Sequence, residues 1–424
     1  MNYRPRTQSS HAPHGPRSRS QHRASHPPFQ RGGSRPPFRR GGDNRGRTPH
    51  GFARGRQHLD ISAFINKAVI VEETEQHFLP EHSFASFPID ERLKKNIIGK
   101  GYTAPTPIQD RAIPHILQGK DVVGIANTGT GKTAAFLIPI INKVLKNPRG
   151  PVLIVVPTRE LAIQINQEFV AFAARLHLFS VCCVGGTNIS PQIRDLRREN
   201  HFVIGTPGRL KDLINRQALN LGATTTVILD EADRMLDMGF LPDMRFIMAR
   251  LPSIRQTLFF SATLSADVKG IIHDFLREPV HISVTTRATA DNIDQNIVRL
   301  KAGQEKLDAL HDLLIRPGFQ KVLIFGRTKY GVEKLAVNLA RRGFRADSIH
   351  GNKSQGQRQR ALGLFKDGRI QALVATDVAA RGLDIANVSH VINYDLPATY
   401  EDYVHRIGRT GRGTCSGSAL TFIE

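Results

Sequence analysis

The order of apolar and polar residues divides the chain into two unlike parts. Residues 1–58 contain no Leu, Ile or Val, whereas from Phe84 onward short apolar runs alternate with segments of helical periodicity such as residues 134–145 and 160–173. Strands that alternate with helices build parallel sheets through crossover connections. The runs predict strands at residues 121–126, 152–156, 181–184, 202–205, 227–230 and 257–261, and again at 322–325, 346–349, 372–375, 390–393 and 419–422.

A polar stretch at residues 285–294 interrupts this alternation. We therefore predict an α/β fold of two domains with parallel sheets, residues 83–285 and 295–424, joined by a linker at residues 286–294. Residues 59–82 form a short N-terminal extension of mixed character. A helix that packs on the first domain is one interpretation of this extension, and the pattern does not indicate its role.

Composition sets the first 58 residues further apart. They hold thirteen Arg, no Lys and one Asp, and so contribute +12 of the formal charge of +22. Such a segment cannot bury enough apolar surface to offset the entropy lost on ordering, so we expect a disordered tail. Its Arg-Gly-Gly sequences at residues 31–33 and 40–42, with Phe29, Phe38 and Phe52 nearby, resemble the RGG-type tails of RNA-binding proteins. Arg pairs with phosphates and Phe stacks on bases, which favours sequence-independent RNA binding over a merely solubilising tail.

The overall charge indicates a class of partner. A pI of about 10.4 favours a polyanion, either nucleic acid or an anionic membrane surface. No segment approaches the run of about twenty apolar residues that a membrane span requires, and the N-terminus lacks the apolar core of a secretory signal. Cys182, Cys183 and Cys415 show neither a disulfide framework nor a zinc-binding spacing. We expect reduced thiols in a cytoplasmic protein.

A glycine-rich loop follows the first predicted strand. Its sequence at residues 126–133 is Ala-Asn-Thr-Gly-Thr-Gly-Lys-Thr. Gly129 and Gly131 let backbone N–H groups turn toward phosphate oxygens. Lys132 supplies a charge for the β- and γ-phosphates, and the Thr133 hydroxyl can bind Mg²⁺. The loop therefore predicts nucleoside triphosphate binding, which the dipole of the following helix supports.

Adjacent carboxylates follow another apolar run about a hundred residues later. The sequence at residues 230–233 is Asp-Glu-Ala-Asp. At the end of a strand, Asp230 can hold Mg²⁺ through water and Glu231 can activate a water molecule. Together with the loop, these carboxylates predict an NTPase site.

A dense arginine cluster lies in the second predicted domain, at residues 405–412. Such a cluster is usually a surface or an RNA contact. Here Arg409 and Arg412 could also reach a γ-phosphate as arginine fingers, which raise rates about 10³- to 10⁵-fold. The predicted catalytic set is therefore Lys132, Asp230, Glu231, Arg409 and Arg412.

With these motifs in place, the chain from Phe84 onward resembles the DEAD-box ATP-dependent RNA helicases of superfamily 2, of the bacterial type. Residues 101–109 look like the family's Q motif, within a region at 82–110. The resemblance implies two RecA-like domains and an ATP site in which Gln109 hydrogen-bonds adenine and Phe84 stacks on it. An amide can donate and accept, and so can read adenine N6 and N7 together. The implied ATP-binding residues are Phe84, Gln109, Thr128, Gly129, Thr130, Gly131, Lys132, Thr133 and Asp384.

The same resemblance implies a path for one RNA strand across both domains. Hydroxyls, Arg side chains and helix N-terminal amides are suitable phosphate donors, so we expect little sequence preference and strong salt dependence. The implied RNA-binding residues are Thr158, Arg159, Gly186, Thr206, Gly208, Arg209, Thr328, Gln355, Arg358, Thr376 and Arg381.

Further family motifs imply coupling between hydrolysis and strand separation. They assign this role to Ser261 and Thr263, and to His405, which would touch them when the domains close. Asn127 departs from the family, which commonly has Gln at this position of the phosphate loop.

These expectations lead to an ATP-dependent RNA helicase with ATP and Mg²⁺ as cofactors. RNA-induced closure of the two domains would drive ATP hydrolysis and local separation of short RNA duplexes or remodelling of RNA–protein complexes. The expected protein is a cytoplasmic monomer, with ribosomal or RNA-decay proteins as candidate partners. Two alternatives remain open: a DNA helicase or translocase with the same two domains, and an ATP-gated RNA clamp or annealing protein.

Overall fold

The computed structural model describes residues 64–65, 78–127, 129–148, 150–284, 293–380, 385, 388–411 and 417–423. All of them belong to one unit, Gln57–Glu424. The tail predicted at residues 1–58 and most of the predicted linker lie outside the described residues. No described helix has the length and apolar character needed to cross a membrane.

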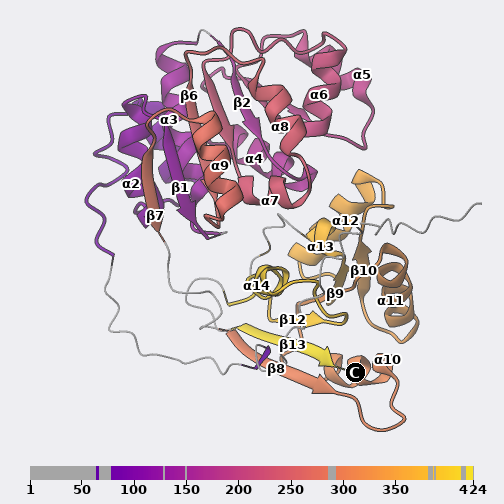
Figure 1. Ribbon diagram of the computed structural model, residues 1–424. Helices are drawn as coiled ribbons and strands as arrows, with labels where there is room; N and C mark the ends of the chain where they lie inside the picture. The colour runs from indigo at the N-terminus through magenta and orange to yellow at the C-terminus, as the bar shows by residue number, and fades with distance from the viewer. Residues whose placement is uncertain are drawn as a thin grey trace, which may run out of the picture. The chain divides into compact units, whose positions relative to one another are not determined.

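The first domain is built on a seven-stranded sheet (Figure 1). Its strands pair in the order β3-β4-β2-β5-β6-β1-β7, and every pairing is parallel. The strands are β1 Val122–Ala126, β2 Val152–Val155, β3 Ser180–Cys183, β4 Phe202–Gly205, β5 Thr226–Leu229, β6 Gln256–Ser261 and β7 Val280–Val284. The edge strand β7 was not predicted, because its partly exposed residues do not form a continuous apolar run.

Helices cover both faces of this sheet. Alternate residues of β2 point to opposite faces: Val152 and Ile154 join one apolar core, and Leu153 and Val155 join the other. Helices α1 to α4 contribute to the first core, and α5 to α9 to the second. The helices are α1 Glu91–Gly99, α2 Pro107–Leu117, α3 Lys132–Lys146, α4 Arg159–Phe172, α5 Ile189–Leu196, α6 Pro207–Asn215, α7 Ala232–Asp237, α8 Leu241–Met248 and α9 Ala266–Phe275.

The second domain has a six-stranded sheet in the order β10-β11-β9-β12-β13-β8, again with parallel pairings. Helices α10 and α11 pack on one core, and α12 and α13 on another. The elements are β8 Ile293–Arg299, α10 Lys306–Leu314, β9 Val322–Phe325, α11 Lys329–Arg341, β10 Ala346–Ile349, α12 Gln355–Lys366, β11 Ala372–Ala375, α13 Asp377–Ala380, β12 His390–Asn393, α14 Tyr400–Ile407 and β13 Gly417–Ile423.

Two boundaries differ from the sequence pattern. The unpredicted strand β8 begins at Ile293, so the last two residues of the expected linker already belong to the second sheet. In the N-terminal extension, Phe64 packs with Ile293, Tyr403 and Ile407 of the second domain. The interpretation of this extension as packing on the first domain is therefore wrong for Phe64.

Parallel pairing determines where function can reside. The carboxyl ends of all strands in such a sheet lie at one edge, where ligands of α/β proteins bind. In the first sheet, β5, β6 and β1 are neighbours. The Asp-Glu-Ala-Asp sequence follows β5, Ser261 ends β6, and the glycine-rich loop follows β1. The neighbours β3, β4 and β2 precede the predicted RNA-binding residues of the first domain. Two predicted sites thus share one edge.

Candidate nucleotide and RNA site

The glycine-rich loop has the backbone conformation that its glycines permit. Gly129 and Gly131 have φ of +87° and +92°, in the left-handed region that favours glycine. α3 begins at Lys132, directly after the loop. The Lys132 side chain is buried, and its Nζ donates to the carbonyl of Ala126, 2.7 Å away. The lysine therefore lies back across the loop that would cradle the phosphates.

Two Q-motif residues donate hydrogen bonds to the backbone of this loop. Thr106 Oγ1 donates to the Thr130 carbonyl at 2.8 Å, and Gln109 Nε2 donates to the Gly131 carbonyl at 3.1 Å. Gln109 Oε1 accepts from the Thr106 N–H at 3.0 Å, so both ends of its amide have partners. Phe84 is buried, with edge contacts to Phe87 and Tyr102. The roles of Gln109 and Phe84 toward adenine stay predictions, and the structure adds a contact between the Q motif and the loop.

The two predicted acidic residues follow β5 directly. Burial raises the pKa of Asp230 to about 7, although the positive charge of Lys132 opposes the rise. Glu231 has φ of +51°, which is unusual for a residue other than glycine. Its carboxylate forms a 2.6 Å ion pair with Arg234, and both side chains are buried. Arg234, which the sequence did not single out, therefore fixes the residue expected to activate water.

The loop and the acidic residues line one hollow of about 200 Å³. Lys132, Thr133, Asp230 and Glu231 all contribute to its wall. Mg²⁺ prefers hard oxygen ligands and is usually held by one or two carboxylates together with phosphates. The Asp230 carboxylate and the Thr133 hydroxyl fit that requirement.

Asp233 joins the acidic sequence to the predicted coupling residues. Its Oδ2 accepts from the N–H groups of Ala262 and Thr263, at 3.0 and 2.9 Å, and from the Thr263 hydroxyl at 3.1 Å. Ser261 Oγ donates to the Thr263 carbonyl. Burial raises the pKa of Asp233, but Lys132 and the surrounding hydrogen bonds outweigh it and hold that pKa below its usual value. Sequence reasoning did not assign Asp233 a role, although it is the last residue of the same motif.

The RNA-binding candidates of the first domain gather after β2, β3 and β4. Thr158 caps α4 and accepts from the Leu161 N–H, and Thr206 with Gly208 lies at the start of α6. Gly186 has φ of +70°, and a Cβ there would overlap Arg159 Nη1. Glycine at this position thus allows the guanidinium to approach the backbone.

Arg209 already has protein partners within this group. Its Nη1 donates to Gln192 Oε1 at 2.9 Å and its Nη2 to the Thr187 carbonyl at 3.0 Å. Burial lowers its pKa. The guanidinium is therefore oriented by neighbouring loops, and its expected contact with RNA remains a prediction.

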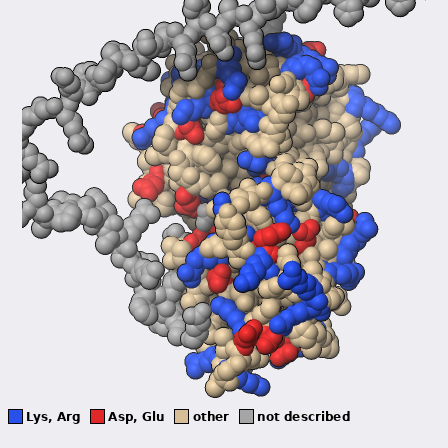
Figure 2. Space-filling model, turned by 90° about the vertical axis from the view of Figure 1, so that its right-hand side faces the viewer, with Lys and Arg blue, Asp and Glu red and all other residues tan. Residues whose placement is uncertain are grey.

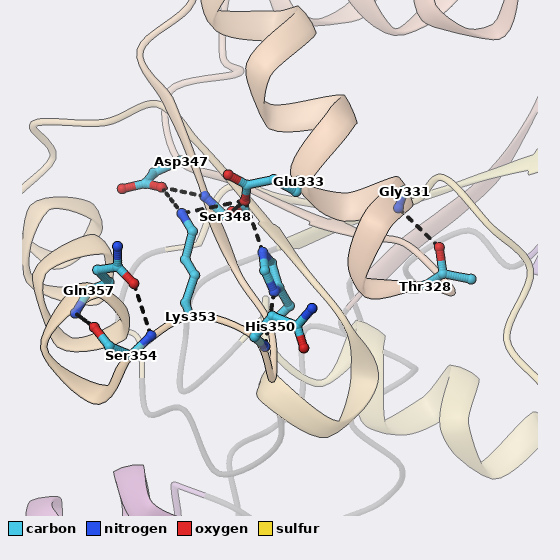
Figure 3. Close-up of polar contacts among 10 residues, drawn as sticks. Thr328, Gly331, Glu333, Asp347, Ser348, His350, Lys353, Ser354 and Gln357 are labelled. Carbon is cyan, nitrogen blue, oxygen red and sulfur yellow. Dashed lines mark hydrogen bonds and ion pairs between the residues drawn. The ribbon is translucent and has the colours of Figure 1, made fainter. Parts of the chain in front are cut away.

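In the second domain, Thr328 and Thr376 both follow strands. Thr328 caps α11 by accepting from the Gly331 N–H at 3.0 Å (Figure 3), and Thr376 lies between β11 and α13. Gln355 and Arg358 are buried instead, and both contact Glu160, at 3.2 and 2.9 Å. Their expected contact with RNA remains a prediction.

Figure 3 also shows a polar network beside Thr328. Glu333 accepts from Ser348, contacts His350 Nε2 at 2.9 Å and lies 3.7 Å from Lys353 Nζ. Lys353 also forms a 2.6 Å ion pair with Asp347. The network connects α11 to the loop that precedes α12.

The arginine cluster begins on α14. Arg406 is 2% exposed and holds Asp377 in a two-pronged ion pair, at 2.5 and 2.8 Å. It also donates to Asn393 Oδ1 and to the Asp395 carbonyl. A small hollow of about 10 Å³ lies beside it, and its lining includes Phe325, Asp377, His405, Arg406 and Arg409. Arg406 was not predicted individually. Its contacts join α14 to α13 and to the end of β12.

Four predicted site residues lie outside the described part of the chain: Thr128, Arg381, Asp384 and Arg412. On the face seen in Figure 2, Lys and Arg form several patches, with smaller groups of Asp and Glu between them. A surface with this excess of positive charge suits a phosphate backbone.

Comparisons with known proteins agree with this geometry. The DEAD/DEAH box helicase family matches residues 106–271, and the helicase conserved C-terminal domain matches residues 305–414. The ATP-dependent RNA helicase CshA of Listeria monocytogenes is 46% identical over 343 residues, which are 80% of this chain and 66% of that protein. The DEAD-box ATP-dependent RNA helicase CshA of Bacillus subtilis is 46% identical over 345 residues, 80% of this chain and 69% of that protein. The chain thus spans about two thirds of the length of these relatives.

Two solved structures have the same fold. S. cerevisiae Dbp5 bound to RNA and ADP BeF3 matches with a TM-score of 0.72 and 29% identity, over 81% of this chain and 89% of that one. Mss116p bound to ssRNA and AMP-PNP matches with a TM-score of 0.73 and 29% identity, over 81% of this chain and 75% of that one. The predicted pair of RecA-like domains is thereby confirmed. The chain belongs to the DEAD-box family of ATP-dependent RNA helicases.

Proposed function

We propose that this protein hydrolyses ATP when it binds RNA, and that this hydrolysis drives local separation of short RNA duplexes or remodelling of RNA–protein complexes. The observation that supports the proposal most directly is the pair of sites at one sheet edge. The nucleotide hollow follows β1 and β5, and the RNA-binding candidates follow β2, β3 and β4. Asp233, through its hydrogen bonds to residues 262 and 263, offers a physical connection from the nucleotide side.

In the proposed chemistry, the loop N–H groups and Lys132 bind the phosphates. Asp230 and Thr133 would hold Mg²⁺, with Asp230 acting through water, and the bound ion would neutralise developing phosphate charge. Glu231, fixed by Arg234, would orient the attacking water. Arg409 and Arg412 would stabilise charge on the γ-phosphate. Gln109 and Phe84 would select adenine.

On the RNA side, the proposal assigns backbone contacts to the threonines and arginines at the strand ends. Such contacts position a strand without reading its sequence. The RNA and nucleotide named in the Dbp5 and Mss116p structures support RNA and ATP as the ligands. As part of the same proposal, the protein is a cytoplasmic monomer whose candidate protein partners are ribosomal or RNA-decay proteins.

The test is steady-state ATP hydrolysis by the full chain with single-stranded RNA, with matched single-stranded DNA and with neither. We expect strong stimulation by RNA alone. Equal stimulation by DNA, or hydrolysis that is independent of nucleic acid, would contradict the proposal. Lys132→Ala should abolish the activity, and Lys146→Ala, at the exposed end of the same helix α3, is the matched control that should leave it intact.

A further inference from the structure

One aromatic side chain from the N-terminal extension is buried in the second domain. Phe64 is 1% exposed, and its ring meets that of Tyr403 edge-on, with centroids 4.7 Å apart and planes at 73°. Ile293, Ile407 and Ala419 complete this small apolar cluster. Figure 1 shows residues 64–65 as a short indigo segment beside β8. Phe64 lies outside both family matches, which cover residues 106–271 and 305–414.

The cluster involves the helix that carries the arginines. On α14, Tyr403 and Ile407 lie four residues apart and so share one side, and both belong to the cluster that contains Phe64. Arg406, which lies between them in sequence, forms the ion pair with Asp377. Arg409, a proposed arginine finger, follows the helix end by two residues.

Tyr403 is held at two points. Its hydroxyl donates to Gln295 Oε1 on β8 at 2.9 Å, and its ring contacts Phe64. Burial raises the pKa of the Tyr403 hydroxyl, as expected for a side chain enclosed on all sides. Among the described residues, Phe64 is the one member of this cluster that lies outside the second domain in the sequence. Its ring therefore covers apolar surface of Tyr403 that residues of the second domain leave open.

We propose that Phe64 is a positioning residue that braces α14, so that Arg406 and Arg409 keep the orientation needed for ATP hydrolysis. The expected effect on ATP hydrolysis rests on the proposed function. The expected effect on the stability of α14 does not. Phe64 touches neither nucleotide nor RNA in this proposal. Its loss should therefore lower turnover and leave ATP binding, which depends on the first domain, nearly unchanged.

The kinetic test compares Phe64→Ala and Phe64→Leu with the wild-type chain in RNA-stimulated ATP hydrolysis. We expect Phe64→Ala to lower kcat about three- to tenfold, with KM for ATP changed less than about twofold. Phe64→Leu should restore most of kcat, because it refills the apolar space. Phe78→Ala is the matched control, since Phe78 is 37% exposed, and it should behave as wild type.

The structural test needs no ATP. Hydrogen exchange of the backbone amides of residues 400–407 should be faster in Phe64→Ala than in wild type and unchanged in Phe78→Ala. Unchanged exchange in Phe64→Ala would overturn the proposal. So would a fall in kcat that disappears once the folded fraction, measured by thermal unfolding, is taken into account. If Phe64→Ala exchanges faster but the wild-type chain shows no RNA-dependent ATP hydrolysis, the structural role of Phe64 is supported. The same result would contradict the proposed function.

Discussion

At the scale of single residues, the nucleotide site depends on backbone conformations that most side chains avoid. Glu231 and Gly131 both have positive φ, and strain of this kind costs about 1–3 kcal/mol for a residue with a side chain. Glu231 nevertheless keeps this conformation beside the buried ion pair with Arg234. Glu231 lines the same hollow as Lys132.

Glu231→Gln tests the water-activating role directly. The amide keeps the size of the side chain but cannot accept a proton, so ATP binding should persist while kcat falls by about 10²- to 10⁴-fold. Nucleotide binding and single-turnover hydrolysis are the measurements. Glu278→Gln is a matched control, because Glu278 also has positive φ but is exposed. Normal turnover by Glu231→Gln would exclude the assigned role.

Gly131→Ala tests how closely the Q motif supports the phosphate loop. A Cβ at Gly131, where φ is +92°, would overlap Gln109 Nε2. We expect KM for ATP to rise at least about tenfold, because the loop must shift to admit the methyl group.

Gly119→Ala separates backbone strain from this crowding. Gly119 has φ of +79°, and a Cβ at this position would have no other atom within 4 Å. The variant should lose about 1 kcal/mol of unfolding free energy with an unchanged KM for ATP. Equal KM values in the two variants would mean that the contact between Gln109 and the loop is unimportant.

Sequence reasoning found the residues that motifs contain, but not those whose role arises from contacts. Lys132, Asp230 and Glu231 were expected, and all line one hollow. The contact of Asp233 with Thr263 joins residues thirty positions apart, which only the folding of β5 beside β6 brings together. Arg234 has no motif of its own, and its pairing with Glu231 depends on the turn that Glu231 makes.

At the scale of elements, every central strand was predicted, whereas two of the four edge strands, β7 and β8, were not. β2 and β5 are fully buried and give continuous apolar runs. β7 and β8 lie at sheet edges, and their mixed burial produces a pattern that resembles a loop. The predicted linker therefore took in the first residues of β8.

The polar network between α11 and β10 makes a prediction at this scale. Hydrogen bonding from Ser348, with further contributions from His350 and Lys353, lowers the pKa of Glu333. A carboxyl group with a lowered folded-state pKa adds stability above its unfolded pKa of about 4.3, and this stability is lost as the pH falls through the folded value. Since Glu333 is half exposed, the contribution should be at most about 1 kcal/mol.

Glu333→Gln should therefore reduce unfolding free energy at pH 7 and flatten its decline on acidification. Chemical denaturation from pH 7 down to about pH 2.5, through the lowered pKa of Glu333, measures both effects. Glu199→Gln, at a side chain that is 78% exposed, serves as the control. A parallel decline in wild type and Glu333→Gln would show that the network does not stabilise the ionised carboxylate.

At the scale of the whole molecule, much of the positive charge expected to bind RNA lies in a segment apart from the predicted catalytic residues. The chain has a formal charge of +22, of which the first 58 residues carry +12, whereas the predicted catalytic residues all lie in the two α/β domains. Contacts between cations and phosphates release counterions, so RNA affinity should fall linearly with salt on logarithmic axes, by about 0.7 units for each phosphate contacted on a single strand.

Removal of residues 1–58 should reduce that slope while leaving the catalytic machinery intact. If the arginines of the tail contact RNA, the slope should become shallower by about 3–6 units, and affinity at low salt should fall most. At saturating RNA, kcat for ATP should stay within about twofold of wild type, because Phe64 and both α/β domains remain. Fluorescence anisotropy across a salt series measures the slope, and steady-state hydrolysis measures kcat. An unchanged slope would assign the tail a role other than RNA binding, whereas a lost kcat would mean that the tail acts on the domains themselves.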